Sequence, residues 1–288
     1  MAEGCLREWM LLGQLPRLEQ RMLWCHVLDV APSWLIAHDT DPLPARALTA
    51  YRELEAKRLA GEPMAYLLGN REFMGHEFVT TADVLIPRPE TEVLVEVAVQ
   101  AIDTLVDRRQ GSTGPIEDAP LRVLDLGTGS GAIAIAIALA RPAVNVTATD
   151  VSQAALDIAG KNAQRLGARI ELLSGNWYHA LPEGVEFDVI VSNPPYIAAA
   201  DHHLHEGDLR FEPMTALSDG ADGLQALQCI VAGAHAVLRP DGALLVEHGW
   251  DQAADVAAMF RQAGWANTTS WPDLAGIARV TGGFLSSS

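Results

Sequence analysis

The spacing of apolar residues predicts helices over the first part of the chain. Between about residues 6 and 59, apolar side chains recur every three or four positions, the period of one face of an α-helix. Pro16, Pro32 and Pro44 stand where such helices would begin, because proline fits the first turn of a helix. We therefore expect a small helical bundle and assign it residues 1–75.

The pattern then changes to that of a β-hairpin. Residues 72–79 are rich in aromatic side chains and contain a central glycine, as hairpins often do. We expect the hairpin near residues 71–87 and assign residues 76–92 to a connector. An apolar helix over 93–105 follows, and the Gly, Ser and Pro content of 107–120 predicts a surface loop.

From residue 121 onward, strand and helix patterns alternate. The sequence predicts strands at 121–126, 145–149, 170–173, 187–192 and 243–247, helices at 132–140, 153–166, about 224–238 and 252–263, and a closing strand pair. Alternation of this kind is typical of an α/β fold with a mostly parallel, doubly wound sheet.

Composition limits the classes of protein. The 288 residues are 49% hydrophobic, yet no apolar run reaches the roughly 18 residues needed to span a bilayer. The first residues also lack the apolar core of a signal peptide, so we expect a cytoplasmic protein with no membrane partner. Cys5, Cys25 and Cys229 form no C-x-x-C pair, which argues against a disulfide framework and a zinc site.

Charge argues against a nucleic-acid partner. The chain has 20 Lys and Arg residues against 37 Asp and Glu residues, which gives a formal net charge of −17 at pH 7. Such a charge repels a phosphate backbone unless a basic surface is strongly segregated. The sequence contains no basic run of that kind, so we expect no direct nucleic-acid binding. A basic protein partner fits the charge better.

The most informative residues follow the strand predicted at 187–192. Asn193, Pro194, Pro195 and Tyr196 must leave the sheet at the strand's carboxyl end, because proline cannot continue the hydrogen-bond ladder. Open α/β sheets bind ligands at that edge. The side-chain carbonyl of Asn193 and the backbone carbonyl of Pro194 could hold both hydrogens of one NH2 group. Tyr196 adds an aromatic face for a planar amide or a base.

A glycine loop lies between the first predicted strand and helix of this α/β region. Gly127, Gly129 and Gly131 follow a G-x-G-x-G spacing, which differs from the dinucleotide motif G-x-G-x-x-G. Glycine lets the backbone approach a ligand and present N–H groups at a helix start. Asp125, just before the loop, could accept a hydrogen bond from a ligand ammonium or from water. A tight strand-to-helix turn without a ligand is the alternative.

Polar and aromatic residues follow the next two predicted strands. Asp150 ends the second strand, where an acid can accept hydrogen bonds from both ribose hydroxyls. Asn176 could contact an adenine edge, and Trp177 could pack on the adenine ring or serve as a core aromatic. Dinucleotides and S-adenosylmethionine both carry this ribose. The loop after residue 192 favours methyl transfer, because it supplies alignment but no titratable group for hydride chemistry.

Together, the Asn-Pro-Pro-Tyr sequence, the glycine loop and Asp150 resemble the class I S-adenosylmethionine-dependent methyltransferases that modify planar or amide nitrogens. Residues 62–73 (EPMAYLLGNREF) and 85–92 (LIPRPETE) are similar to the PrmC/HemK family, as are 212–217 and 273–280. This family methylates the glutamine side chain in the Gly-Gly-Gln motif of peptide chain release factors. The pair Ile277-Ala278 departs from the more polar pair expected there, so we assign that segment no site role.

The resemblance implies a Rossmann-like domain with a seven-stranded, mostly parallel sheet at residues 93–288, preceded by the hairpin connector and by a helical bundle that docks the release factor. It implies S-adenosylmethionine as cofactor, S-adenosylhomocysteine as product and no metal. The residues expected around the cofactor are Asp125, Gly127, Thr128, Gly129, Gly131, Asp150, Asn176, Trp177 and Asn193. Asn193, Pro194 and Tyr196 are expected to be catalytic and, with Pro195, to bind the glutamine amide.

Other interpretations stay open. A sister enzyme that methylates a glutamine of a ribosomal protein would share the fold, the cofactor and the Asn-Pro-Pro-Tyr sequence. A nucleic-acid adenine N6-methyltransferase needs the same cradle for a flipped base, although the charge opposes it. A catalytically silent nucleotide-binding or scaffold module would keep only the fold.

Two groups of histidines need a separate interpretation. His202, His203 and His205 precede Glu206 and could bind a metal, but their crowded spacing matches no zinc motif. We expect a solvated or lid-like loop there. His248 is expected to be a strand-end histidine and not a catalytic base.

Overall fold

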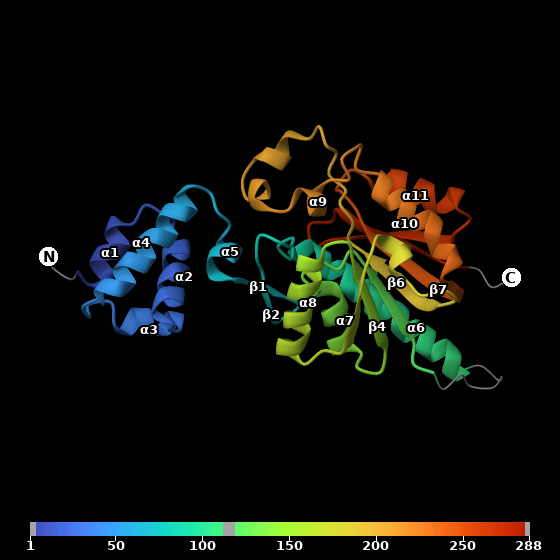
Figure 1. The fold of residues 1–288 in the computed structure, drawn as a ribbon, viewed down its shortest axis with the longest axis horizontal. Helices are drawn as coiled ribbons and strands as arrows, with labels where there is room; N and C mark the ends of the chain where they lie inside the picture. The colour runs from blue at the N-terminus through green and yellow to red at the C-terminus, as the bar shows by residue number, and fades with distance from the viewer. Residues whose placement is uncertain (1–3, 112–118, 286–288) are drawn as a thin grey trace. The chain divides into compact units, whose positions relative to one another are not determined.

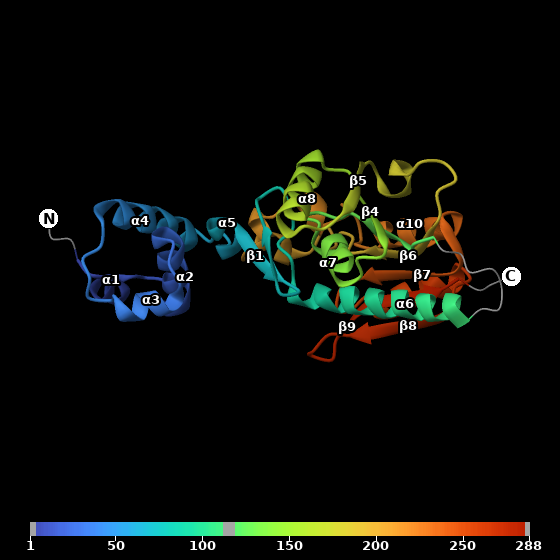
Figure 2. The same cartoon turned by 90° about the horizontal axis from the view of Figure 1, so that it is seen from below.

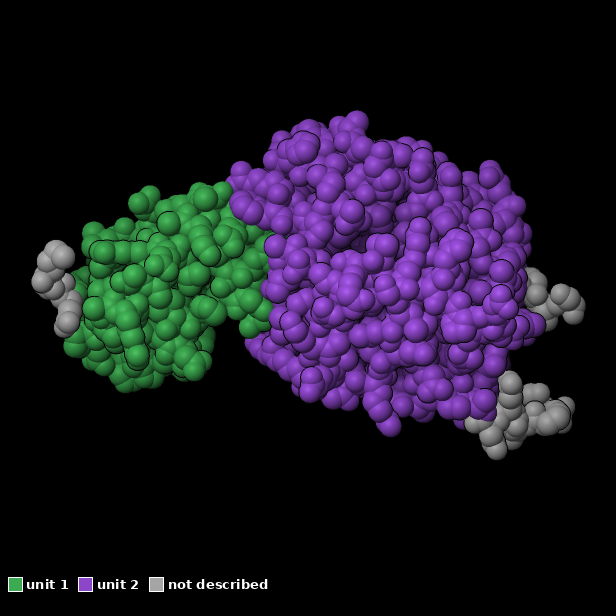
Figure 3. Space-filling view, in the orientation of Figure 1, with its two compact units in different colours: residues 1–70 green, residues 71–288 purple. Residues whose placement is uncertain are grey.

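The computed structural model describes residues 4–111 and 119–285. The chain divides into two compact units, residues 1–70 and 71–288, drawn as a ribbon in Figure 1 and in separate colours in Figure 3. The division thus falls before the end of the range 1–75 assigned to the bundle from the sequence. In the described part of the chain, no helix is long and apolar enough to cross a membrane.

The first unit is a helical bundle, as the apolar spacing predicts. Its helices are α1 (Leu6–Leu12), α2 (Arg17–Leu28), α3 (Pro32–Ala37), α4 (Ala45–Leu59) and α5 (Met64–Leu68). Pro16 and Pro44 directly precede α2 and α4, and Pro32 is the first residue of α3. In the core, the ring of Trp24 stacks on that of Tyr51 with centroids 4.1 Å apart. This contact joins α2 to α4.

The predicted hairpin is present but short. Its strands are β1 (Asn70–Phe73) and β2 (His76–Val79). Met74 and Gly75 between them have φ angles of 51° and 77°, as a two-residue hairpin turn with a left-handed backbone requires. Residues 80–88 form no strand, and Pro87 among them has no backbone N–H to donate to one. The hairpin therefore ends earlier than the predicted residue 87.

Seven strands form one sheet in the second unit. They are β3 (Arg122–Leu126), β4 (Asn145–Asp150), β5 (Ile170–Ser174), β6 (Phe187–Ser192), β7 (Leu238–Glu247), β8 (Ala266–Pro272) and β9 (Ala278–Phe284). Their spatial order is β5-β4-β3-β6-β7-β9-β8. The pairs within β3 to β7 are parallel, and β9 pairs antiparallel with β7 and β8. The mostly parallel, doubly wound sheet is confirmed.

Helices cover both faces of the sheet (Figures 1 and 2). The longer helices of this unit are α6 (Glu92–Gly111), α7 (Ala132–Ala140), α8 (Gln153–Leu166), α10 (Gln225–Gly233) and α11 (Ala253–Gln262). Side chains of α6, α7 and α8 pack on the face that carries Val123 and Val189, whereas α10 and α11 pack on the face that carries Leu124 and Ile190. The side chains of successive strand residues thus pack into the cores on opposite faces of the sheet, as strand geometry requires.

Several short elements connect these layers. They are η1 (Pro89–Thr91), η2 (Trp177–Ala180), η3 (His202–His205), η4 (Leu209–Phe211), α9 (Met214–Leu217) and η5 (Ala234–Ala236). Among them, η1, η2 and α9 include residues that line the main cavity described below.

Helix α6 continues past its predicted end at residue 105. It runs through Gly111, so part of the loop predicted at 107–120 is helical, and residues 112–118 lie outside the described ranges. Arg108 and Arg109 fall in its last turn, where positive charge suits the helix dipole. Arg109 also pairs with the buried carboxylate of Asp188. Arg109 therefore takes part in a structural ion pair.

The order of strands changes direction around β3. Strand β4 flanks β3 on one side and β6 flanks it on the other. Such a switch point leaves a crevice at the carboxyl ends of the strands, where doubly wound sheets bind ligands. The glycine loop, Asp150 and Asn193 all lie at these strand ends.

Candidate active site

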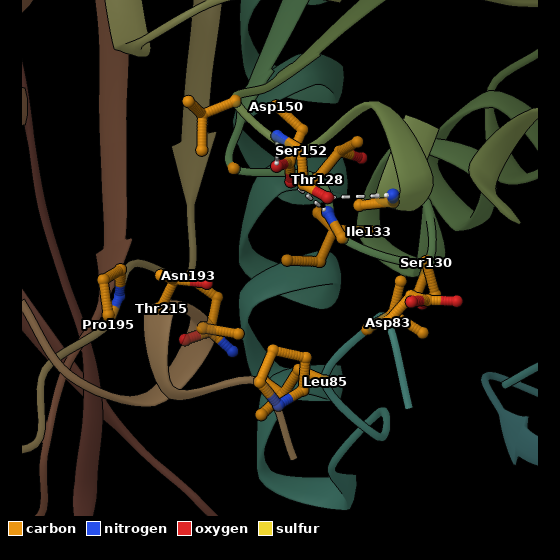
Figure 4. A pocket seen from close by; sticks show the side chains of 18 of the residues that line it. Asp83, Leu85, Thr128, Ser130, Ile133, Asp150, Ser152, Asn193, Pro195 and Thr215 are labelled. Atoms are coloured by element: carbon orange, nitrogen blue, oxygen red, sulfur yellow. Dashed lines mark hydrogen bonds between the residues drawn. The ribbon is translucent and has the colours of Figure 1, made fainter. Parts of the chain in front are cut away.

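A cavity of about 340 Å³ opens at the carboxyl ends of β3, β4 and β6 (Figure 4). Of the residues expected around a cofactor, those that line it are Gly127, Thr128, Gly129, Asp150, Asn176, Trp177 and Asn193. Pro195 lines it as well, and much of the remaining wall comes from residues 82–91 and 213–216. The structure thus brings most of the predicted site residues into one place.

The carboxylate of Asp150 holds two backbone N–H groups at the cavity wall. Its Oδ2 accepts a hydrogen bond from Gly129 at 2.8 Å, and its Oδ1 accepts one from Ser152 at 2.9 Å. Gly129 has a φ angle of 54°, which glycine adopts without strain. Because each carboxylate oxygen has a second lone pair, Asp150 can order the glycine loop and still accept hydrogen bonds from a ligand's hydroxyls.

Trp177 packs against the glycine loop. A Cβ atom on Gly127 would lie 3.2 Å from the Trp177 ring, and the φ angle of Gly127 is 73°, so this position favours glycine. Trp177 lines the cavity and also packs against the core cluster that includes residues of α10 and α11. Trp177 thus contributes to the core and also reaches the cavity, and its contact with an adenine ring stays a prediction.

Two residues expected to contact the cofactor, Asp125 and Gly131, do not line the cavity. Asp125 is fully buried, and its Oδ2 accepts a hydrogen bond from the Thr128 hydroxyl at 2.6 Å. Burial raises the pKa of Asp125 to about 7. A Cβ on Gly131 would lie 2.9 Å from Ile135 and 3.0 Å from Ala159. Asp125 therefore supports the loop from behind, and Gly131 lets α7 pack closely on α8.

The Asn-Pro-Pro-Tyr loop, residues 193–196, leaves the sheet directly after β6, as predicted. The Nδ2 atom of Asn193 donates a hydrogen bond to Oγ1 of Thr91, 3.1 Å away. This leaves Oδ1 as the acceptor on the other side of the amide. Asn193 and Pro195 line the cavity, whereas Pro194 is buried and lines neither this cavity nor the second one.

Tyr196 faces a second cavity of about 540 Å³. Its hydroxyl donates to Oε1 of Glu247 at 3.3 Å, and its backbone carbonyl accepts from Nε2 of Gln252 at 3.0 Å. Burial raises the pKa of Tyr196, so its hydroxyl stays protonated near neutral pH. A Cβ on Gly223 would lie 2.3 Å from the Tyr196 carbonyl oxygen. The backbone of the loop is therefore held in place from two sides.

The second cavity has a charged lining. Besides Tyr196 and Glu247, its lining residues are Arg88, Glu90, His203, Glu206, Gly207, Asp208, Leu209 and Arg279. Arg88 also lines the main cavity. Arg279 belongs to the 273–280 segment, to which the sequence analysis gave no site role, and its side chain is held by Asp273 at 2.8 Å. The Asn-Pro-Pro-Tyr loop therefore contributes to both cavities, with Asn193 and Pro195 on the main cavity and Tyr196 on the second.

Glu212 joins two segments of the cavity wall. Its carboxylate accepts a hydrogen bond from the backbone N–H of Ile86 at 3.0 Å and pairs with the guanidinium of Arg88. Burial raises the pKa of Glu212, although the charge of Arg88 opposes this shift. Sequence analysis noticed both segments, 85–92 and 212–217, but missed Glu212. Ile86 and Glu212 are 126 positions apart, so no local pattern reveals their contact.

Thr91 and Glu247 are the other residues that sequence analysis missed. Thr91 is 4% exposed and Glu247 is 2% exposed, and each contacts one side chain of the Asn-Pro-Pro-Tyr loop. Burial raises the pKa of Glu247 to about 7. The segment LIPRPETE contains Thr91. The family resemblance therefore pointed to this region, but it did not show that Thr91 contacts Asn193.

His248 agrees with its sequence interpretation, whereas the loop predicted around His202 forms the short 3-10 helix η3. His248 is fully buried, and its two ring nitrogens contact the Gly249 carbonyl and the Thr281 hydroxyl, both at 2.9 Å. It is a strand-end histidine, as expected. His202 and His203 are exposed, and their possible ligand atoms lie within 4.8 Å of one another and of Asp201. Exposed groups of this kind are common without an ion, and we assign this one no role.

Two family models match the chain. The PrmC N-terminal domain model matches residues 12–69, which lie in the first unit. The Methyltransferase small domain model matches residues 115–207, which include the glycine loop, Asp150 and the Asn-Pro-Pro-Tyr loop.

Solved methyltransferase structures share the fold. The hMettl16 catalytic domain in complex with a 3′UTR hairpin aligns with a TM-score of 0.54 at 16% identity, over 82% of this chain and 84% of that one. The T. thermophilus 16S rRNA methyltransferase RsmC, in complex with AdoMet and guanosine, aligns with a TM-score of 0.52 at 18% identity, over 75% of this chain and 49% of that one. The expected class I S-adenosylmethionine-dependent methyltransferase fold is confirmed.

Bacterial proteins named release factor glutamine methyltransferase match nearly the whole chain. The Bordetella pertussis (strain Tohama I) protein is 58% identical over 94% of this chain and 96% of its own length. The Burkholderia pseudomallei (strain K96243) protein is 50% identical over 94% of this chain and 93% of its own length. Since both units take part in these matches, the chain belongs to the family of release factor glutamine methyltransferases.

Proposed function

We propose that this protein transfers a methyl group from S-adenosylmethionine to the side-chain amide nitrogen of the glutamine in the Gly-Gly-Gln motif of peptide chain release factors. The observation that carries the proposal is the position of Asn193. Its amide stands at the cavity wall with Nδ2 engaged by Thr91, so Oδ1 is available to accept a hydrogen bond from a substrate NH2 group.

The main cavity fits the proposed cofactor. Asp150 would accept hydrogen bonds from the ribose hydroxyls, the glycine loop would present its backbone to the ligand, and Asn176 and Trp177 would contact the adenine. A Cβ on Gly127 would sit 3.2 Å from the Trp177 ring, so glycine at this position leaves room for the indole at the cavity wall. When bound, S-adenosylmethionine supplies an activated methyl group on its sulfonium.

Asn193 and Pro194 would orient the acceptor. An amide nitrogen is a poor nucleophile because its lone pair is delocalised into the carbonyl. Oδ1 of Asn193 would accept one N–H hydrogen at the cavity wall. The backbone carbonyl of Pro194, a residue that lines neither cavity in this structure, would have to be reached by the other. With both hydrogens accepted, positive charge can build up on nitrogen and the lone pair points at the methyl donor. The protonated product amide is acidic enough to lose its proton to water. This is consistent with a loop that carries no titratable group near neutral pH.

The second cavity would hold the peptide around the glutamine. It lies beside Tyr196, directly after the residues that would bind the amide. The acidic residues on its lining outnumber the two arginines, Arg88 and Arg279; they are Glu90, Glu206, Asp208 and Glu247. The whole chain carries a formal charge of −17. Both features favour a basic peptide over a phosphate backbone.

The helical unit would dock the body of the release factor, with residues 71–92 as the connection to the methyltransferase domain. Large apolar side chains are exposed at the end of α1 and along α2: Leu11, Leu12, Leu18 and Met22. Leu18 and Met22 are four positions apart and share one face of α2. Exposed apolar groups of this kind are typical of protein-binding surfaces. A partner in translation termination would also place the protein in the cytoplasm.

A substrate panel tests this proposal against its rivals. Purified release factor, ribosomal protein and DNA are each incubated with the protein and methyl-labelled S-adenosylmethionine. We expect transfer to the release factor only. Preferential labelling of the ribosomal protein would support the sister activity, labelling of DNA would support adenine methylation, and failure to bind the cofactor would indicate a silent module.

A further inference from the structure

Glu212 forms an ion pair that joins a buried carboxylate to a partly exposed arginine. Its Oε2 accepts a hydrogen bond from the backbone N–H of Ile86 at 3.0 Å, and its Oε1 pairs with Nη2 of Arg88. The side chain of Glu212 is 0% exposed, whereas that of Arg88 is 29% exposed. The carboxylate is therefore fixed by two partners, and it in turn holds one nitrogen of a guanidinium that solvent or a ligand can reach.

Arg88 has hydrogen-bond donors that this ion pair does not use. A guanidinium carries five N–H donors in a rigid, planar fork. Within the described ranges, the guanidinium of Arg88 donates through Nη2 alone, which leaves the N–H groups of Nε and Nη1 for a ligand. Arg88 lines both the main cavity and the second cavity. Its remaining donors therefore suit a substrate that lies along the Asn-Pro-Pro-Tyr loop.

The backbone of Arg88 is tied to the proposed acceptor site. Its carbonyl accepts a hydrogen bond from the N–H of Thr91 at 3.1 Å, and Oγ1 of Thr91 accepts one from Nδ2 of Asn193 at 3.1 Å. One turn of the chain therefore carries both Arg88 and the partner of Asn193. Arg279, the other arginine on the second cavity, does not line the main cavity. Arg88 is thus the arginine that the two linings share.

The chemistry of the acceptor determines what these donors can bind. Two glycines precede the glutamine in a Gly-Gly-Gln segment, and glycine offers only main-chain N–H and carbonyl groups. The acidic lining of the second cavity can accept the N–H groups, but a carbonyl oxygen taken out of water needs a donor. A guanidinium on the glutamine's own side-chain carbonyl would draw the nitrogen lone pair further into that carbonyl. A main-chain carbonyl is therefore the better partner for Arg88.

We propose that Glu212 is a positioning residue for the acceptor: through its ion pair it holds the remaining N–H groups of Arg88 so that they donate to a main-chain carbonyl of the Gly-Gly-Gln segment. This proposal rests on the proposed function, because it needs that segment as the acceptor. Arg88 touches the substrate, and Glu212 acts through Arg88. Since a charged donor binds a carbonyl more strongly than a neutral one, loss of either residue weakens binding of the release factor and spares binding of S-adenosylmethionine.

Single substitutions at the two residues test the proposal. Glu212→Gln keeps an oxygen that can accept from Ile86 but removes the charge that holds Arg88. Arg88→Lys keeps a positive charge for Glu212, yet one ammonium cannot serve a carboxylate and a carbonyl in a planar fork. We expect each variant to raise the KM for the release factor about 10-fold, the effect of one hydrogen bond to a charged group. The kcat, and the Kd for S-adenosylmethionine measured by calorimetry, should stay within about 2-fold.

A double variant and a second substrate exclude a merely structural role. Because Glu212 acts through Arg88, combining Arg88→Lys with Glu212→Gln should raise KM no more than the worse single variant does. A short Gly-Gly-Gln peptide flanked by alanines should lose as much in kcat/KM as the release factor, since the contact lies within the shared segment. Glu77→Gln is the matched control. It breaks the exposed ion pair of Glu77 with Arg165, 3.0 Å apart, and neither residue lines either cavity, so KM should not change.

The outcomes separate this proposal from the proposed function. If the unaltered protein binds S-adenosylmethionine but does not methylate the release factor, both fail. If the unaltered protein is active and Glu212→Gln keeps its KM, or raises the Kd for S-adenosylmethionine as much as the KM, only the role of Glu212 is overturned. A loss confined to the intact release factor would place Arg88 against another part of the partner and overturn it too. Should Glu212→Gln fail to fold, Arg88→Lys decides, and an unchanged KM overturns the proposal.

Discussion

Oδ2 of Asp150 accepts a hydrogen bond from the backbone N–H of Gly129 at 2.8 Å. One carboxylate at the end of β4 therefore fixes the shape of a loop that follows β3, and it does so on the wall of the main cavity. Asp150 therefore orders the glycine loop and is also the residue proposed to bind the ribose.

Replacement of this carboxylate should weaken cofactor binding. We expect Asp150→Ala to raise the Kd for S-adenosylmethionine by about 10-fold to 100-fold, because hydrogen bonds to a charged group contribute about 1.5–3 kcal/mol. Isothermal titration calorimetry measures the change. Asp157→Ala is the matched control, since Asp157 is an exposed carboxylate on α8 whose side chain accepts a hydrogen bond only from Gln153 among the described residues. If the two variants bind S-adenosylmethionine with equal affinity, Asp150 does not bind the ribose.

The buried Asp125 should make stability depend on pH. Its pKa is raised to about 7 in the folded protein, against about 3.9 in an unfolded chain. Between these values the folded state holds a proton that the unfolded state has lost, so the free energy of unfolding falls as pH rises from about 4 to 7. Below about pH 4 the protonated Asp125 side chain makes its full contribution to the free energy of unfolding, and above about pH 7 that contribution is lost.

Asp125→Asn removes this titration while it keeps an oxygen to accept from Thr128. We expect the stability of the variant, measured by urea unfolding at a series of pH values, to fall less steeply than that of the unaltered protein between about pH 4 and 7. Two parallel curves would show that Asp125 is ionised in the folded protein.

The helical unit offers a test of the docking proposal. Leu18 on α2 is 69% exposed, so Leu18→Glu should leave the fold intact. We expect it to raise the KM for an intact release factor about 5-fold or more, the effect of about 1 kcal/mol at a protein interface. A short peptide that contains Gly-Gly-Gln is the control substrate, and its methylation should not change. If both substrates respond alike, α2 does not dock the release factor.

Much of the architecture could be predicted from local pattern. The helices at 132–140 and 153–166 and the strand at 187–192 match their predicted bounds, because each has strong periodicity or a continuous apolar run between clear turn residues. The predicted end of α6 at residue 105 was wrong, because the residues that follow include good helix formers and no early stop signal. Its last turn is held by the pairing of Arg109 with Asp188, which depends on the tertiary fold.

The candidate site could be predicted only where a residue stands at a strand end. Asp150 and Asn193 fulfil this condition, and both line the cavity. Asp125 stands close to a strand end too, but it is fully buried and does not line the cavity. Thr91 and Glu247 were missed because their contacts with the Asn-Pro-Pro-Tyr loop join residues 102 and 51 positions apart.

The most direct test of the central claim is tandem mass spectrometry of a release factor after incubation with this protein and S-adenosylmethionine. We expect a gain of one methyl group, about 14 Da, on the glutamine of its Gly-Gly-Gln motif. Asn193→Ala should bind the cofactor yet lower the rate of this modification by about 10²-fold or more. A release factor that stays unmodified, or a methyl group on any other residue, would contradict the account.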